Sequence, residues 1–210
     1  MHDEAPPATD PGPPLQLSRG RAFVYVLPVR DDTVFKIGFA RDPLQRWRSL
    51  HPRCLRSFEF RAGVLVETAR VAQARAFERS LLHRFADWTA LAPLAVEPAA
   101  GGGNEWFRGV LEDAADAAQA LASAGGFTVS RPIAHWLRVV FEERRAALFG
   151  WSARMLEVIE YARHNMPQDP STHRYEQALS DVLASAAELG IDVDALVPAA
   201  VARWRAAHAD

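Results

Sequence analysis

Residues 22–39 decide the first half of the fold, and they read AFVYVLPVRDDTVFKIGF. Two runs rich in β-branched and aromatic residues, 22–28 and 33–39, flank the more polar segment 29–32. Short apolar runs of this composition around a polar connection predict a β-hairpin. Gly38, inside the second run, indicates a position that another backbone segment or a ligand approaches closely.

The segments that follow the hairpin predict a small α+β domain. Asp42 before Pro43 supplies an N-cap side chain and a first-turn proline, which predicts a short helix over 43–50. We expect four further elements in order: a third strand over 57–67, a helix over 68–85 capped by Thr68, a proline- and glycine-rich loop that ends at 104–107, and a helix over 109–124.

Beyond Phe127 the pattern predicts helices only. Apolar residues recur at helical spacing from Ile133 to Ile159, in a run that Gly150 either bends or divides, and two more helices are expected over 174–189 and 194–208. We therefore expect a proline-rich disordered tail over 1–20, an α+β domain over 21–125 with a three-stranded antiparallel sheet flanked by helices, and an all-helical accessory domain over 126–210.

Composition excludes several classes of protein. With 210 residues, 49% of them hydrophobic and 24% charged, the chain is globular. No apolar run is long enough for a membrane-spanning helix, so no membrane partner is expected. The first twenty residues do not resemble a secretory signal. The single cysteine, Cys54, excludes an intramolecular disulfide and a Cys-built zinc site, so a reducing cytoplasmic location is expected.

Charge is distributed unevenly along the chain. Residues 21–85 hold thirteen basic and six acidic side chains, whereas residues 86–125 hold one basic and six acidic. A basic surface attracts polyanions, so DNA is the expected partner of residues 21–85. The alternative is a solvated surface in an arginine-rich protein, since 23 of the 24 basic residues are Arg. The candidate nucleic-acid-binding residues are Arg41, Arg48, His51, Arg53 and Arg56, and Arg46 lies within the same basic segment.

Two charged residues stand at apolar positions. Glu78 falls in the apolar stripe of the helix expected over 68–85, where a carboxylate needs compensation. Three interpretations stay open: a buried ion pair with an arginine, a stripe-edge position that reaches solvent, or a metal ligand. Lys36, the only lysine in the chain, lies mid-strand between apolar residues and must have a partner or face water.

The order of these residues carries a resemblance over residues 22–110. Tyr25, the segment Phe35-Lys36-Ile37-Gly38, Arg46, the segment from Glu78 to Phe85 and Glu105-Trp106-Phe107 together resemble the GIY-YIG nuclease superfamily. Within it they resemble the phage T5 open-reading-frame 172 type, also called the meiotically up-regulated gene 113 type. The resemblance departs from the superfamily pattern at Phe23, where the pattern has glycine, and at Lys36, where it has tyrosine.

The resemblance implies a metal-dependent endonuclease that hydrolyses DNA phosphodiester bonds. It implies that Tyr25 contacts the phosphate or the attacking water, with the role of general base as one option. It also implies that Arg46 stabilises charge on the phosphate and that Glu78 holds one divalent ion, Mg²⁺ or Mn²⁺. Lys36 completes the candidate catalytic set, as a phosphate ligand or a proton acceptor.

Other functions and roles remain open at this stage. A module of this fold that binds DNA without cleaving it is the main alternative, and a domain that binds an acidic protein is the third. His51 is either a proton donor or acceptor near the site or a surface histidine after a helix end. Glu105 either helps to position the site or belongs to a loop anchored by its aromatic neighbours. We expect the C-terminal helices to support oligomerisation or substrate choice.

Overall fold

The computed structural model describes residues 20–96, 105–166 and 170–208, in two compact units. The first unit, Gln16–Leu137, carries a β-sheet, and the described part of the second begins at Arg138 and is helical. The expected tail before Gly20 lies outside the described residues, as does most of the glycine-rich part of the expected loop. None of the helices in the described ranges is long and apolar enough to cross a membrane.

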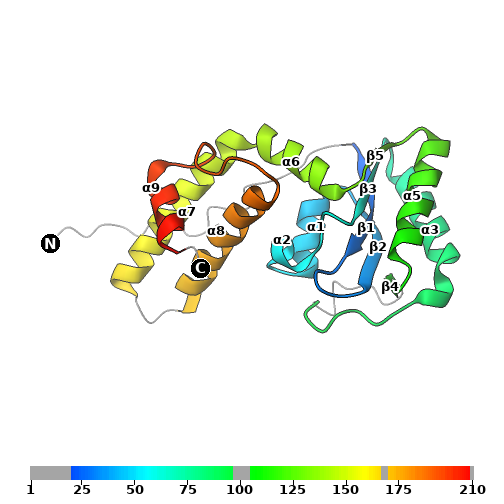
Figure 1. The fold of residues 1–210 in the computed structure, drawn as a ribbon, viewed down its shortest axis with the longest axis horizontal. Helices are drawn as coiled ribbons and strands as arrows, with labels where there is room; N and C mark the ends of the chain where they lie inside the picture. The colour runs from blue at the N-terminus through cyan, green and yellow to red at the C-terminus, as the bar shows by residue number, and fades with distance from the viewer. Residues whose placement is uncertain (1–19, 97–104, 167–169, 209–210) are drawn as a thin grey trace. The chain divides into compact units, whose positions relative to one another are not determined.

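The first unit is built on a five-stranded antiparallel sheet with the strand order β4-β2-β1-β3-β5 (Figure 1). The predicted hairpin lies at its centre. The expected number of three strands is too small, because two edge strands of three residues each are too short to show a periodic pattern. The strands are β1 (Ala22–Pro28), β2 (Val34–Ala40), β3 (Val64–Thr68), β4 (Trp106–Arg108) and β5 (Thr128–Ser130).

Helices cover both faces of this sheet (Figure 1). On one face α3 (Val71–Arg84) and α5 (Leu111–Gly125) bury alternate residues of β1, and on the other face lie α1 (Pro43–Leu50) and α2 (Cys54–Ser57). Successive side chains of a strand point to opposite faces of the sheet. Because helices cover both of these faces, all the side chains of β1 are buried. A central strand with this environment is apolar throughout, which explains the continuous run that opens the domain.

Several predicted boundaries hold and others shift for visible reasons. Asp42 caps α1 as expected, and its carboxylate accepts a hydrogen bond from the Gln45 amide at 3.0 Å. The N-cap of helix α3 is Arg70, two residues later than the predicted Thr68, because Thr68 pairs within β3 and donates its hydroxyl to the Ala22 carbonyl at 2.9 Å. The third strand is shorter than the 57–67 expected, since the start of that segment belongs to α2 and the turn after it.

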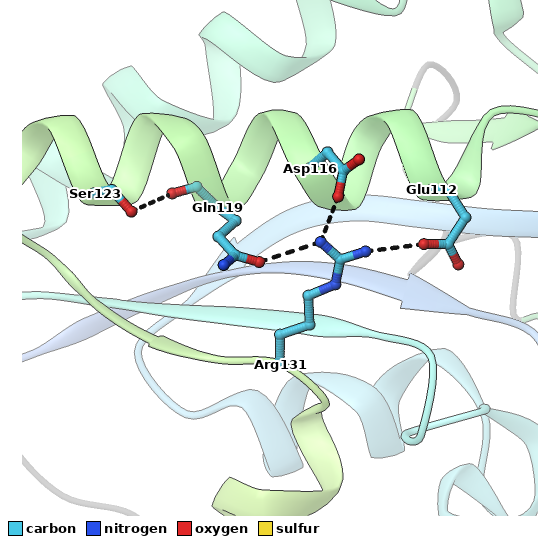
Figure 2. Close-up of polar contacts among 5 residues, drawn as sticks. All are labelled: Glu112, Asp116, Gln119, Ser123 and Arg131. Atoms are coloured by element: carbon cyan, nitrogen blue, oxygen red, sulfur yellow. Dashed lines mark hydrogen bonds and ion pairs between the residues drawn. The ribbon is translucent and has the colours of Figure 1, made fainter.

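The chain after α5 corrects the expectation of helices only. It first forms β5, which pairs with β3 as the last strand of the sheet. Arg131, directly after β5, contacts α5 through Glu112 at 2.8 Å, Asp116 at 2.5 Å and Gln119 at 3.1 Å, as Figure 2 shows. These contacts fasten the end of β5 to the helix that covers it, so the sheet unit extends beyond the limit of 125 that the sequence suggested.

The second unit contains the end of α6 (Ile133–Glu143) together with α7 (Arg145–Asn165), α8 (Pro170–Glu188) and α9 (Ala199–Ala207). Helix α7 packs against α8 and α9. The long apolar run divides at Arg144, whereas Gly150 lies within α7. The buried side chains of α7, Leu148, Trp151, Met155 and Ile159 among them, form a core as their helical spacing indicated.

Candidate active site

Tyr25 lies in the middle of β1, directly opposite Gly38 of β2. A β-carbon at Gly38 would meet the tyrosine Oη at 2.6 Å, so the glycine leaves the space that the phenol occupies. The ring packs edge-on against Trp47 of α1, with centroids 5.9 Å apart, and the residue is 1% exposed. A close approach at Gly38 was expected from another backbone segment or a ligand, but it is made by the Tyr25 side chain of the neighbouring strand.

Arg46 extends from α1 to this phenol. Its guanidinium forms a hydrogen bond with the hydroxyl of Tyr25, and its Nη1 lies 3.3 Å from Ser49 Oγ. Burial raises the pKa of Tyr25 above its usual value, while the charge of Arg46 acts in the opposite direction. The phenol therefore keeps its proton near neutral pH. Arg46 also lines, with Arg41, an open hollow of about 530 Å³ at the start of α1.

Glu78 comes from α3, on the other face of the sheet, and meets the edge of β2. Its carboxylate forms a hydrogen bond with the backbone of Phe39. Two residues earlier, the Ile37 amide donates to the Glu105 carbonyl at 3.0 Å, so amides along this edge point away from β1. Burial, followed by the charge of Glu105, raises the pKa of Glu78 to about 7, against the opposing charges of Lys36 and Arg46.

Lys36 has a partner and does not face water. Its side chain is 0% exposed, and its Nζ lies 2.5 Å from Oε2 of Glu105, which is 32% exposed. The same ammonium lies 5.0 Å from the ring centroid of Trp106, a cation–π distance. Burial lowers the pKa of Lys36, and the hydrogen bond and charge of Glu105 act against that change.

The four candidate catalytic residues lie together around Gly38, with Glu105 as a fifth member. Tyr25, Lys36 and Glu78 each carry a pKa shift to which Arg46 and Glu105 contribute. Tyr25 and Lys36 are buried at the base, whereas Arg46, Glu78 and Glu105 are partly exposed above them. Glu105 was not in the candidate catalytic set, although the sequence left open that it helps to position the site. The signal for it was a lone mid-strand lysine that needs an anionic partner when it is buried.

One of the candidate nucleic-acid-binding residues lies beside Arg46. Arg41 is exposed and lines the same hollow as Arg46. Arg48 lies on α1, Arg53 in the turn before α2 and Arg56 on α2. Like His51, they are not among the lining residues of that hollow in the described structure. His51 Nδ1 accepts the Arg53 amide at 3.1 Å and lies 2.8 Å from Ser57 Oγ, so this histidine holds the turn between the two helices.

The donor set limits which metal ion fits. Among the described residues no group of three or more His, Cys, Asp or Glu side chains could hold a metal. A closed zinc-type site therefore does not fit these residues. A hard ion such as Mg²⁺ keeps several waters and takes one or two carboxylates plus substrate oxygens, and a partly exposed Glu78 is compatible with that arrangement. A cation would also relieve the unfavourable ionisation of this carboxylate that burial causes.

The site therefore lies in a small α+β domain and combines a buried tyrosine and lysine with three partly exposed charged residues, Arg46, Glu78 and Glu105. A family model for the T5orf172 domain matches residues 22–122. This part of the chain is therefore similar to the T5orf172 domain, a family of nuclease-like or DNA-binding domains. Neither the curated proteins nor the solved structures contain a match to the chain.

Proposed function

We propose that this T5orf172-like domain is a GIY-YIG-type, metal-dependent endonuclease that hydrolyses DNA phosphodiester bonds. The observation that carries the proposal is the convergence of Tyr25, Lys36, Arg46 and Glu78, from both faces of one sheet, around Gly38. These residues are far apart in the sequence and come from β1, β2, α1 and α3. A structural role alone does not require a phenol, an ammonium, a guanidinium and a carboxylate at one point of a sheet.

Each of these residues can have a separate role in phosphodiester cleavage. Arg46 offers a planar fork of donors to phosphate oxygens, and its position at the hollow makes it accessible. Tyr25, kept protonated by burial, donates a hydrogen bond or holds water near the phosphate. A divalent ion held by Glu78 would supply positive charge near the reacting oxygens. The exposed Arg41 extends the cationic surface along which the DNA backbone lies.

Cleavage of supercoiled plasmid tests the proposal. Wild-type protein is incubated with plasmid in Mg²⁺, in Mn²⁺ and in chelator, beside Glu78→Ala and the control Glu157→Ala, which removes an exposed helical glutamate of α7. We expect metal-dependent nicking by wild type and the control, and a loss of at least 100-fold in Glu78→Ala. An intact plasmid under every condition refutes the enzyme, and equal nicking by all variants identifies a contaminant.

The second candidate is a DNA-binding module without turnover. It is favoured by Lys36, which is fully buried and paired, at a place where the resembling superfamily has a tyrosine. Such a module would bind duplex DNA with an affinity that falls linearly with salt on logarithmic axes, yet would leave the plasmid intact. The same salt titration separates it from a domain that binds an acidic protein, because DNA would then compete weakly or not at all.

A further inference from the structure

The two partners of the Lys36–Glu105 ion pair differ in their exposure to solvent. The lysine is 0% exposed and its ammonium is enclosed by the Glu105 carboxylate and the Trp106 ring. Glu105 is 32% exposed, and its Oε2 accepts a hydrogen bond from the lysine. A carboxylate has a second oxygen, here Oε1, which can accept a hydrogen bond from another group. A phosphate or water arriving from solvent therefore meets Glu105 before it can meet Lys36.

The backbone places Glu105 beside Glu78. The Ile37 amide donates to the Glu105 carbonyl, and the next outward-pointing amide along β2, that of Phe39, is the partner of Glu78. Two residues of a strand span about 6.6 Å, so the two acidic residues are attached at neighbouring points of one sheet edge. The charge of Glu105 acts on both Glu78 and Tyr25, which places its carboxylate within the same cluster.

We propose that Glu105 is a catalytic residue of this site, whose Oε1 accepts a hydrogen bond from the water that attacks the phosphodiester, and that Lys36 is its positioning residue. This inference rests on the proposed endonuclease function. Lys36 contacts no phosphate in this scheme; it fixes one oxygen of Glu105 from below and leaves the other turned to the site. Among the described residues, Arg46 of α1 and Glu78 of α3 are charged groups on other elements that act on Lys36.

A double-mutant cycle tests whether the two residues act as one unit. Single-turnover cleavage and metal-free DNA affinity are measured for Glu105→Gln, Lys36→Met and the double variant, with Glu112→Gln of α5 as the exposed control. We expect a loss of about 100-fold in cleavage for Glu105→Gln, 10- to 100-fold for Lys36→Met, and no further loss in the double variant beyond Glu105→Gln. DNA affinity should change less than twofold in all of them. Glu105→Asp should recover part of the rate.

The single lysine provides a readout that is independent of cleavage. Protein labelled with ¹⁵N at lysine Nζ gives one side-chain signal, because Lys36 is the only lysine. We expect this signal to keep its position when duplex DNA is added in chelator, and to shift in Glu105→Gln. A large shift on DNA binding, or a Lys36→Met variant that weakens DNA affinity tenfold, assigns the lysine to the phosphate and overturns the proposal.

Failure of the two proposals can be told apart. If wild type cleaves DNA but the rate losses of the two single variants multiply in the double variant, Glu105 and Lys36 act independently. Their proposed coupling is then wrong, and the proposed endonuclease function is unaffected. An unchanged rate in Glu105→Gln removes Glu105 from the reaction. Absence of wild-type cleavage in both metals refutes the endonuclease, and with it the catalytic role of Glu105. Melting curves confirm that each variant is folded, and Glu105→Gln retains an oxygen acceptor for the buried ammonium.

Discussion

Gly38→Ala should both destabilise the protein and reduce its activity, because the glycine makes room for the Tyr25 hydroxyl. The new β-carbon would lie 2.6 Å from Tyr25 Oη, 2.8 Å from Cζ and 3.0 Å from Cε2. Favourable contacts between such atoms lie near 3.5–4.0 Å, so the phenol must move by roughly 1 Å. It has little space to do so, because the ring is 1% exposed and packs against the fully buried Trp47.

Two opposing effects determine how much Gly38→Ala changes the free energy of unfolding. Overpacking of a buried site costs about 1–3 kcal/mol. Replacement of glycine by alanine in regular structure returns about 0.5–1 kcal/mol, because the unfolded chain loses freedom. The net loss in the free energy of unfolding should be about 1–2 kcal/mol. A displacement of about 1 Å at a reacting group can lower the rate by about 100-fold, so cleavage should fall further than stability alone explains.

Urea denaturation and single-turnover cleavage measure the two effects. Gly150→Ala is the matched control, since a β-carbon there would meet only Arg154 Nη1 at 3.4 Å on helix α7, and it should stabilise the protein slightly. Tyr25→Phe combined with Gly38→Ala removes the 2.6 Å contact but keeps the one at 2.8 Å, so it should regain part of the stability and none of the activity. A Gly38→Ala variant as stable and active as wild type would refute this account of Tyr25.

Three further outcomes can be measured on the purified protein. In chelator, Glu78→Gln should be more stable than wild type by about 1–2 kcal/mol above pH 7, after discounting for partial exposure, and equally stable below pH 4.5. Because folding raises the pKa of Glu78 from 4.5 to about 7, wild type loses stability as the pH rises through this window, and the glutamine variant does not. A difference in unfolding free energy between the two proteins that is the same at both pH values, measured by urea denaturation, would contradict this prediction. Asp42→Ala should lower stability by about 1 kcal/mol, because the Gln45 amide loses its cap, and calorimetry should show a lower Tm. Arg131→Met should cost about 1 kcal/mol at low salt and less in 1 M NaCl, since its contacts to α5 are partly exposed; a salt-independent loss would point to packing instead.

Local patterns in the sequence were sufficient where an element is long or capped. The hairpin, α1 with its Asp42 cap and the C-terminal boundary of α5 at a left-handed Gly126 all lie close to where the residues predict them. The edge strands β4 and β5 were missed, because a three-residue strand is defined by the neighbour with which it pairs. The start of α3 was misplaced because the Thr68 hydroxyl bonds across the sheet to Ala22 rather than to its own helix.

The candidate site could be predicted in part. Tyr25, Lys36, Arg46 and Glu78 were identified from their order, and the structure brings them together, although their roles remain proposals. The pairing of Lys36 could not be read from sequence spacing, since Glu105 lies 69 residues away. The burial of Tyr25 and Lys36 could not be predicted from the sequence either, because it depends on helices that pack on both faces of the sheet.

The short strand β4 explains why the charged groups gather at one end of β2. Among the described residues, it pairs with β2 over Val34 to Lys36, and no described strand covers the edge of β2 beyond Ile37. Helix α3 packs on one face of β2 and α1 packs on the other, so a carboxylate from α3 and a guanidinium from α1 can meet at this edge. A longer β4 would occupy the Phe39 amide that Glu78 now uses. The proposed site thus requires the short edge strand, and an insertion that extended β4 by two pairing residues should displace Glu78 and abolish cleavage while leaving the central hairpin intact.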